Sequence, residues 1–369
     1  MRINIAASHR FHLLDLAREL ECQGHDVCFY SYVPTNRAVK FGLKKENCIS
    51  LFYLILPIIV IEKFFKTLSF TTKIKFNILD YYLAFFMKPC DVYIALGTVY
   101  VKSFEMAKKK YNAKTIVEWG SKHIIEQEKA ILDGTNAKRV PRYFINRSLK
   151  AYELVDFISV PSRHVKDTFL LHNFSEKKII LNPYGVDLSM FRPTTLDNAD
   201  TFDVIMVGNW SLTKGCDLII ESLSNTNIKF LHVGSIKDLK FPDFPNMKHV
   251  DAVDQTELIK YYSRAKIFLL PSRAEGLALV QAQAIACGLP IVCSKDTGGE
   301  DLQSLISDKR WILLLNKTDE VNIRHNVNEA LQLANTQKGV RNYAGEDIHS
   351  LTWKAYGERY NNNLNCICL

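Results

Sequence analysis

The sequence predicts an α/β protein with two doubly wound, parallel-sheet domains joined by a linker. Apolar runs of strand length alternate with helical segments through most of the 369 residues. The alternation breaks once, at residues 182–200, where prolines, a glycine and several polar residues follow one another. It resumes at residue 202, and a chain of this length is expected to form two domains of ordinary size.

The first half of the chain contains the elements of one such sheet. Residues 3–8 predict a strand, and residues 11–24 predict a helix with one apolar face that ends at Gly24. Further strands are expected at residues 26–32, 92–97, 114–119 and 156–161. Because these strands are separated by crossover segments, we expect them to run parallel.

The second half repeats the pattern, so we expect two Rossmann-like domains that face each other across a cleft. Its strands are expected at residues 202–208, 228–234, 266–271 and 290–294. An aromatic and charged helix near residues 350–363 is expected to pack back on the first domain. The expected boundaries are 1–183 for the N-terminal domain, 184–200 for the linker, 201–348 for the C-terminal domain and 349–369 for the returning helix.

Composition and charge exclude several classes of protein. The nine cysteines show no CxxC pair and several lie in apolar runs, which indicates reduced thiols and a cytoplasmic location rather than a disulfide framework. The chain opens on a strand-like segment, so no signal peptide is expected. The net charge of +8 comes without any nucleic-acid-binding motif, and we expect no nucleic-acid partner.

Residues 49–61 form an apolar run of thirteen residues that raises the question of a membrane. The run is shorter than the roughly twenty residues of a transmembrane helix, and Pro57 interrupts it. A buried strand or helix is expected. Insertion into the interface of a membrane is the alternative, because lysines alternate with aromatic residues just downstream. These lysines are Lys63, Lys66, Lys73, Lys75 and Lys88.

The C-terminal residues 366–369, CICL, formally fit a prenylation box. No polybasic stretch or second lipid signal precedes them, so we do not expect them to be lipidated.

The stretch 271–292, PSRAEGLALVQAQAIACGLPIV, predicts a strand end, a turn and a helix from about residue 277 to 287. Gly288 supplies the helix stop. The N-terminus of this helix is a potential anion site, and Gly276 lets a ligand approach the backbone. Glu275 would repel a phosphate, so it is better suited to accept hydrogen bonds from hydroxyl groups.

Gln283 follows Glu275 by eight residues, which is roughly 12 Å along a helix. Two hydroxyl-seeking side chains with an anion site between them match a sugar, a diphosphate and a ribose. A dipole-complementing glutamate with a solvated amide explains the two residues equally well when the stretch is taken alone. Lys214, directly before Gly215 at the start of another predicted helix, favours the first interpretation because a lysine there suits a diphosphate.

Four segments, taken in their order along the chain, resemble a known family. They are YELVDFISVPSRHVKDTF, ILNPYGVDLSMFRP, MVGNWSLTKGCDLI and LLPSRAEGLALVQAQAIACGLPIVCSKDTGGEDL. Together they resemble the retaining GT-B glycosyltransferases of the glycosyl transferases group 1 family, also called family 4. The resemblance is close over residues 152 to about 302 and loose in the N-terminal domain.

This resemblance implies roles for residues of the C-terminal domain. The family's E-x7-E motif falls on Glu275, which would contact the hydroxyls of the donor sugar, and on Gln283, which would hold the ribose. The backbone of Gly276, Leu277 and Leu279 would face the diphosphate and the sugar. The basic pair of the glycine-rich loop after Gly208 falls on Asn209 and on Lys214, which precedes Gly215, so phosphate binding would depend on Lys214.

The resemblance also implies an acceptor side in the N-terminal domain. The usual glycine pair after the first strand is replaced by residues 6–10, where Ser8 and Arg10 are candidates on the phosphate side. The segment 117–127 carries His123, our candidate for the histidine near the transferred sugar, with Ser121 beside it. His12 is a weaker candidate that we expect to face outward from its helix.

The implied activity is retaining transfer from a UDP- or GDP-linked sugar to a glycan or lipid-linked acceptor, in cell-surface polysaccharide or glycolipid assembly. No D-x-D triplet or zinc-ligand spacing occurs, so we expect no metal and no cofactor. A nucleotide-sugar 2-epimerase of the same fold and a catalytically weak sugar-nucleotide binder are the alternatives. The basic, aromatic N-terminal domain suggests a peripheral position on an anionic membrane surface.

Overall fold

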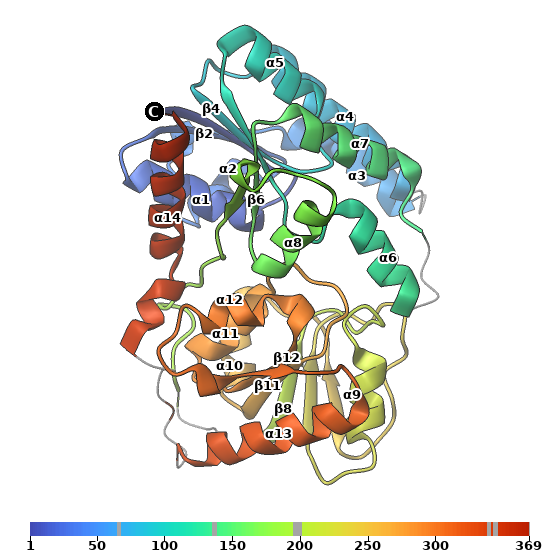
Figure 1. The fold of residues 1–369 in the computed structure, drawn as a ribbon. Helices are drawn as coiled ribbons and strands as arrows, with labels where there is room; N and C mark the ends of the chain where they lie inside the picture. Colours follow the sequence, from blue (N-terminus) through green and yellow to red (C-terminus); the bar gives the residue numbers. More distant parts are fainter. Residues whose placement is uncertain (65–67, 135–138, 195–200, 338–340, 342–345, 369) are drawn as a thin grey trace.

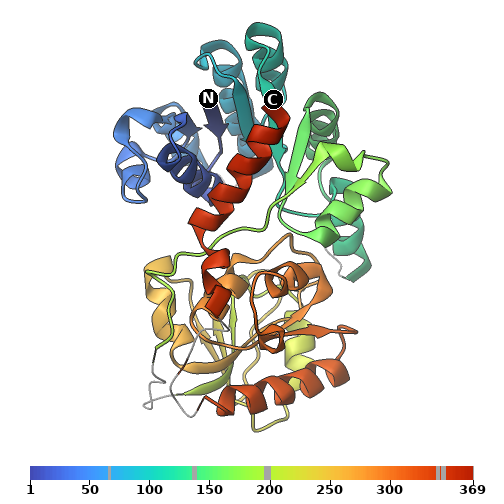
Figure 2. The same ribbon diagram turned by 60° about the vertical axis from the view of Figure 1, so that its left-hand side comes forward.

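The computed structural model describes residues 1–64, 68–134, 139–194, 201–337, 341 and 346–368. Two α/β units lie one above the other, and each is built on a parallel sheet (Figures 1 and 2). The predicted fold class is therefore confirmed. We call the units the N-terminal and C-terminal domains.

The N-terminal sheet has seven strands in the order β3-β2-β1-β4-β5-β6-β7, and all neighbouring strands run parallel. Its strands are β1 Arg2–Ala6, β2 Asp26–Ser31, β3 Cys48–Ser50, β4 Val92–Leu96, β5 Lys114–Glu118, β6 Phe157–Val160 and β7 Ile179–Leu181. The strands were predicted from their apolar runs, except for β3 and β7. Each of these two has only three residues, which is too short to show a period.

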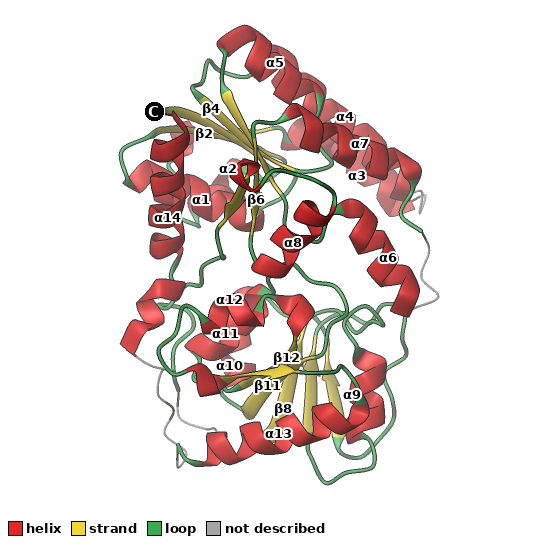
Figure 3. Cartoon of the chain, viewed as in Figure 1, coloured by secondary structure: helices red, strands yellow, loops and turns green. Residues whose placement is uncertain are grey.

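Helices cover both faces of this sheet (Figure 3). They are α1 Phe11–Cys22, α2 Thr35–Val39, α3 Phe52–Phe64, α4 Leu68–Phe86, α5 Lys102–Tyr111, α6 Ile124–Gly134, α7 Arg142–Leu154 and α8 Arg163–Leu171. Short 3-10 turns add η1 Lys45–Asn47 and η2 Glu176–Lys178. The apolar face predicted for the first helix is buried, and Gly24 follows it with a φ of 86°.

The C-terminal sheet has six parallel strands in the order β10-β9-β8-β11-β12-β13. Its strands are β8 Phe202–Val207, β9 Phe230–Val233, β10 Met247–Val250, β11 Ala265–Leu270, β12 Ile291–Ser294 and β13 Ile312–Leu315. Its helices are α9 Cys216–Leu223, α10 Leu258–Tyr262, α11 Leu279–Ala286, α12 Gly299–Gln303 and α13 Glu320–Asn335. The 3-10 turns are η3 Gln255–Glu257, η4 Lys295–Thr297, η5 Lys309–Trp311 and η6 Glu346–Leu351.

The last helix, α14 Trp353–Cys368, leaves the C-terminal domain and packs on α1 (red in Figure 2). A side chain at Gly357 would collide with Glu19 of α1, so the two helices approach closely. The segment before β8 also packs on the rest of the protein. Val186 forms a β-bridge with Thr352, and Phe191 is buried against Tyr262 of the C-terminal domain.

A buried carboxylate ties α14 to the N-terminal sheet. Glu118, at the end of β5, accepts a hydrogen bond of 2.7 Å from the Tyr360 hydroxyl, and its other oxygen lies 2.9 Å from Nε2 of His12. All three side chains are at most 6% exposed. Burial raises the pKa of Tyr360 well above its usual value, so Tyr360 remains a neutral donor.

The structure corrects the expectation that residues 49–61 are buried. Most of this run forms α3, and only Ile55 among its described residues 52–62 is fully buried. Tyr53 is 81% exposed and Phe64 is 74% exposed. The apolar run exceeds what the core of the domain can cover, and the remainder lies at the surface. No helix in the described ranges is long and apolar enough to cross a bilayer.

We expect Tyr360→Phe to lower the free energy of unfolding by about 1–3 kcal/mol, because it leaves an oxygen of a buried carboxylate without its donor. Urea denaturation followed by circular dichroism measures the change. Tyr53→Phe removes the same hydroxyl from an exposed side chain and is the matched control, with an expected change near zero. Equal effects of the two substitutions would contradict the assigned role of Tyr360.

Candidate active site

A cavity of about 730 Å³ lies between the two domains, at the carboxyl ends of β4, β5 and β8. Ligands of open α/β sheets bind at these strand ends. The N-terminal domain contributes Phe11, His12, Leu96, Gly97, Thr98, Glu118, Trp119, Gly120, Ser121 and Gln127. Tyr184 and the C-terminal residues Val207, Gly208, Asn209, Lys214, Glu275, Leu277, Ala278, Leu279 and Val280 complete the lining.

The loop from β8 to α9 positions Lys214 at this cavity. Gly215 has a φ of 72°, and a side chain there would collide with the carbonyl group of Pro271 at the end of β11. This close approach brings the β8–α9 loop against the β11–α11 loop. Lys214 therefore lies beside Glu275, although the two residues are far apart in the sequence.

Lys214 and Glu275 form an ion pair at the mouth of α11. Both side chains are about four-fifths buried. Burial lowers the pKa of Lys214 to about 8, because the charged ammonium loses hydration. The pair places one cation and one hydrogen-bond acceptor next to the first turn of α11, where Leu279 and Val280 line the cavity.

The backbone of Glu275 is hydrogen-bonded to residues of both domains. Its N–H donates to the carbonyl of Asp296 at 3.0 Å, and its carbonyl lies 2.9 Å from Nε2 of His164 in the N-terminal domain. The next residue, Gly276, packs directly on Gly120, and its carbonyl accepts a 2.8 Å hydrogen bond from Ser162. Gly276 was expected to face a ligand. Instead, its carbonyl is bonded to Ser162 of the N-terminal domain, and a side chain at this position would point at Gly120 of the same domain.

Leu277 and Leu279 line the cavity, and α11 begins two residues later than predicted, at Leu279. The predicted stop at Gly288 is present, with a φ of 76°. Gly208 and Asn209 also line the cavity, and Asn209 is exposed.

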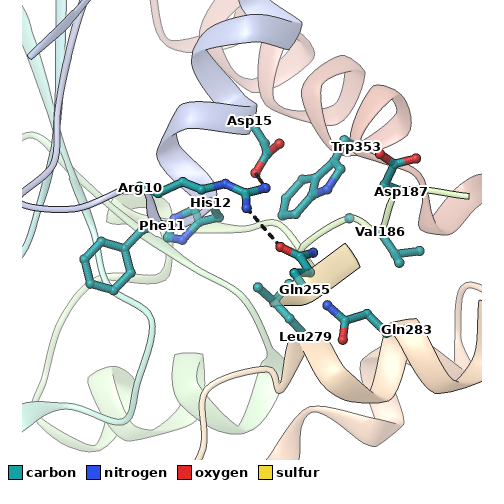
Figure 4. Close-up of a pocket in the computed structure, with 11 residues that line it drawn as sticks. Arg10, Phe11, His12, Asp15, Val186, Asp187, Gln255, Leu279, Gln283 and Trp353 are labelled. Atoms are coloured by element: carbon teal, nitrogen blue, oxygen red, sulfur yellow. Dashed lines mark hydrogen bonds and ion pairs between the residues drawn. The ribbon is translucent and has the colours of Figure 1, made fainter. Parts of the chain in front are cut away.

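Gln283 lies in an adjoining cavity of about 180 Å³ that Figure 4 shows. Its Oε1 accepts a hydrogen bond of 3.2 Å from Tyr262, and it is 7% exposed. Leu279 lines both cavities, so the two spaces adjoin.

Arg10 reaches across this smaller cavity rather than into the larger one. Its guanidinium donates to Oε1 of Gln255 in the C-terminal domain at 2.9 Å (dashed in Figure 4). It also lies 3.5 Å from the ring centroid of Phe41. Ser8, the other phosphate-side candidate, is buried and lines none of the cavities described.

The two histidines differ from expectation. His12 does not face outward: it is 6% exposed, bonds to Glu118 and lines both cavities. His123 is 2% exposed in an aromatic cluster, where its ring stacks on His172 at 3.9 Å. Burial lowers the pKa of His123 to about 4. Ser121, two residues earlier, does line the larger cavity.

The sequence interpretation missed the strand-end residues Gly97, Thr98, Glu118 and Trp119 as cavity residues. The predicted strands 92–97 and 114–119 contained the available signal, because residues at the carboxyl ends of parallel strands meet at one edge. Within the described ranges, no group of three or more acidic, histidine or cysteine side chains is arranged to hold a metal ion.

Comparisons with known proteins agree with this architecture. Residues 191–346 match the family model of Glycosyl transferases group 1. The sulfoquinovosyl transferase SQD2 of Arabidopsis thaliana is 24% identical over 240 residues, which cover 58% of this chain and 47% of that protein. A D-inositol 3-phosphate glycosyltransferase of Paenarthrobacter aurescens is 26% identical over 37% of this chain and 39% of its own length. The chain thus spans about half or less of the length of these curated relatives.

Solved structures match over the whole chain. A sucrose-phosphate synthase from Thermosynechococcus elongatus superposes with a TM-score of 0.70 at 16% identity, covering 100% of this chain and 99% of that one. HepE of Anabaena, solved with UDP and glucose, gives a TM-score of 0.63 at 12% identity, covering 99% of this chain and 100% of HepE. Residues 191–346 are therefore similar to the glycosyl transferases group 1, and the chain shares the two-sheet GT-B architecture of these solved structures.

Proposed function

We propose that this protein is a glycosyltransferase that moves a sugar from a nucleotide-diphosphate sugar to a glycan or lipid-linked acceptor. One observation carries the proposal: Lys214 and Glu275 meet at the mouth of α11, inside a cavity that both domains line. The names of the curated relatives, a sulfoquinovosyl transferase and D-inositol 3-phosphate glycosyltransferases, support a transfer reaction.

The C-terminal wall suits a nucleoside diphosphate and the sugar attached to it. The Lys214 ammonium and the first turn of α11 would stabilise the negative charge that develops on the departing diphosphate. Glu275 would accept hydrogen bonds from sugar hydroxyls. A bound diphosphate would compete with Glu275 for Lys214, and the freed carboxylate would then be available to orient the sugar. Gln283, in the adjoining cavity, is proposed to reach the ribose.

The N-terminal wall would position the acceptor. In a retaining reaction the acceptor hydroxyl attacks the same face of the sugar and passes its proton to the departing diphosphate, so the protein contributes placement and charge stabilisation. His12, rather than His123, is the histidine that lines the cavity. Ser121 is on the same wall, and Arg10 bridges the neighbouring cavity.

Several finer points belong to the same proposal. The donor is UDP- or GDP-linked, the reaction is retaining, and it needs no metal or cofactor. The protein works in the cytoplasm on cell-surface polysaccharide or glycolipid assembly, peripherally on an anionic membrane surface. Support for the membrane comes from the exposed apolar residues of α3 and α4 and from the net charge of +8.

A catalytically weak sugar-nucleotide binder is the second candidate. It is favoured by Asn209, an exposed neutral side chain where the family has a basic one. A nucleotide-sugar 2-epimerase would also use this fold. Product analysis with donor alone distinguishes the three, since an epimerase converts the donor without acceptor and a binder releases no nucleotide.

We expect Glu275→Gln and Lys214→Ala each to lower kcat/KM for transfer by roughly a hundredfold or more, because each removes a group from the charge-stabilising wall. Radiolabelled sugar transfer measures the loss, and thermal melting checks that both variants are folded. Glu358→Gln and Lys354→Ala on α14 are matched controls, since these residues form a more exposed pair at 3.9 Å. Full activity of either active-site variant would refute its assigned role.

Nucleoside diphosphate affinity should fall as pH rises through about 8, the pKa of Lys214, because the lysine then loses the charge that attracts phosphate. Between pH 7 and 9 we expect about a tenfold increase in Kd for UDP or GDP, measured by calorimetry. Lys214→Arg keeps its charge over this range and should flatten the profile. An unchanged slope in Lys214→Arg would assign the titration to another group.

Transfer should continue in excess chelator, because the proposed charge stabilisation comes from Lys214 and α11 rather than from a divalent ion. Initial rates with EDTA and with added Mg²⁺ test this, and equal rates are expected. Loss of activity in EDTA with recovery in Mg²⁺ would overturn the metal-independent mechanism.

A further inference from the structure

Two connected hollows lie beside the active-site cavity, on the side where α2 and α3 face η3. One has a volume of about 730 Å³ and the other about 910 Å³, and they share Arg10, Arg37, Phe41 and Gln255. The small cavity of Figure 4 also contains Arg10 and Gln255, together with His12 and Leu279 of the active-site cavity. The hollows therefore adjoin the small cavity, and the hydrogen-bonded pair of Arg10 and Gln255 lies where they meet. We call the two hollows together the side groove.

One wall of the side groove is apolar. Helix α3 contributes Phe52, Ile55 and Ile59, and Phe41 closes the wall. Because these side chains offer neither charge nor hydrogen bonds, this part of the groove suits a hydrocarbon chain.

The other wall is cationic. Arg37 and Lys40 line it, and both are exposed. Three carboxylates also line the groove. Asp15 pairs with Arg18 at 2.8 Å, and Asp187 accepts hydrogen bonds from Ser189. Asp254 accepts a 3.0 Å hydrogen bond from the backbone N–H of Thr256, and this bond and the nearby charges of Arg37 and Arg10 lower its pKa. The exposed cations Arg37 and Lys40 have no carboxylate of the described residues within ion-pair distance, so they suit an anionic group.

The far side of α3 continues the apolar wall to the protein surface. Tyr53, Val60 and Phe64 are 81%, 49% and 74% exposed. Thirteen helical residues span only about 20 Å, less than the roughly 30 Å of a bilayer core, so α3 suits a position at the membrane surface. A molecule leaving a bilayer along α3 would meet the apolar wall first and the cations next.

We propose that the side groove binds the acceptor, and that this acceptor is a lipid with an anionic head group. The hydrocarbon lies against α3, the charged group lies between Arg37 and Lys40, and the acceptor hydroxyl reaches toward His12 and the active-site cavity. This assignment rests on the proposed transferase function and specifies its acceptor class. It also explains why apolar surface and exposed cations adjoin one edge of the interdomain cleft.

The experiment uses dodecyl phosphate as the probe, at a concentration at which it is monomeric, and measures its Kd for the full chain by calorimetry. Butyl phosphate carries the same head group with a short chain, and inorganic phosphate has no alkyl chain. We expect dodecyl phosphate to bind at least about tenfold more tightly than butyl phosphate, because additional methylenes are buried. Equal affinity of the three probes would show a phosphate site without lipid recognition and would overturn the proposal.

Two variants test the two walls separately. Arg37→Gln should weaken dodecyl phosphate binding by about tenfold, through loss of a charged contact. Ile59→Asn should weaken it by about fivefold or more, by making the apolar wall polar. The controls are Arg310→Gln and Ile236→Asn, at exposed positions of the C-terminal domain, where no change is expected. Equal effects of a variant and its control would overturn the assignment of that wall.

UDP and GDP affinities, measured on the same samples, separate this inference from the proposed function. Both variants should bind nucleoside diphosphate as the unmodified protein does, because neither position lines the donor cavity. If the unmodified protein binds neither nucleotide, the transferase proposal fails. If a nucleotide binds but dodecyl phosphate does not, only the acceptor assignment fails.

Discussion

The site depends on one steric constraint, the direct backbone contact between Gly276 and Gly120. A side chain at Gly276 would collide with the Gly120 carbonyl, so the loop before α11 lies flat against the N-terminal domain. Ser162 and His164 add hydrogen bonds to the carbonyls of Gly276 and Glu275. Because this loop ends in α11, the same contact sets the distance between the helix mouth and the strand ends of the opposite domain. The shape of the active-site cavity follows from it.

Within that cavity, Lys214 and Glu275 have related roles. Each neutralises the other, which reduces the cost of holding two charges in a largely buried place. The same burial lowers the pKa of Lys214 to about 8, so its charge varies with pH near neutrality. In the proposed reaction, a diphosphate that displaces this ion pair would release Glu275 for the sugar, so one pair of side chains would have two successive roles.

In the N-terminal domain, one side of the sheet is bonded to α1 and α14, whereas α3 exposes apolar surface. Glu118 joins β5 to α1 and α14 through His12 and Tyr360, so the last helix of the chain stabilises the wall opposite Lys214. Helix α3 instead leaves much of its apolar surface uncovered. The first arrangement stabilises the N-terminal wall of the cavity, and the second offers a surface along which the proposed apolar acceptor would approach it. The two features lie on opposite faces of one sheet and serve different parts of the proposed reaction.

The sequence by itself determined the fold class, the central strands of both sheets, the returning helix and the loops that carry Lys214 and Glu275, because alternating apolar runs, glycines and helix stops are local signals. It did not reveal the edge strands β3, β7, β10 and β13. Residues whose position depends on distant contacts could not be placed in this way. The burial of His12 is an example. Its ring is bonded to Glu118, which is more than a hundred residues away in the sequence, so no local pattern around His12 reveals this partner. Only the tertiary structure decided that Gly276 faces Gly120, that Arg10 reaches Gln255 and that α3 remains exposed. The physical reason is that periodicity specifies which face of an element is apolar, whereas packing between domains decides what that face meets.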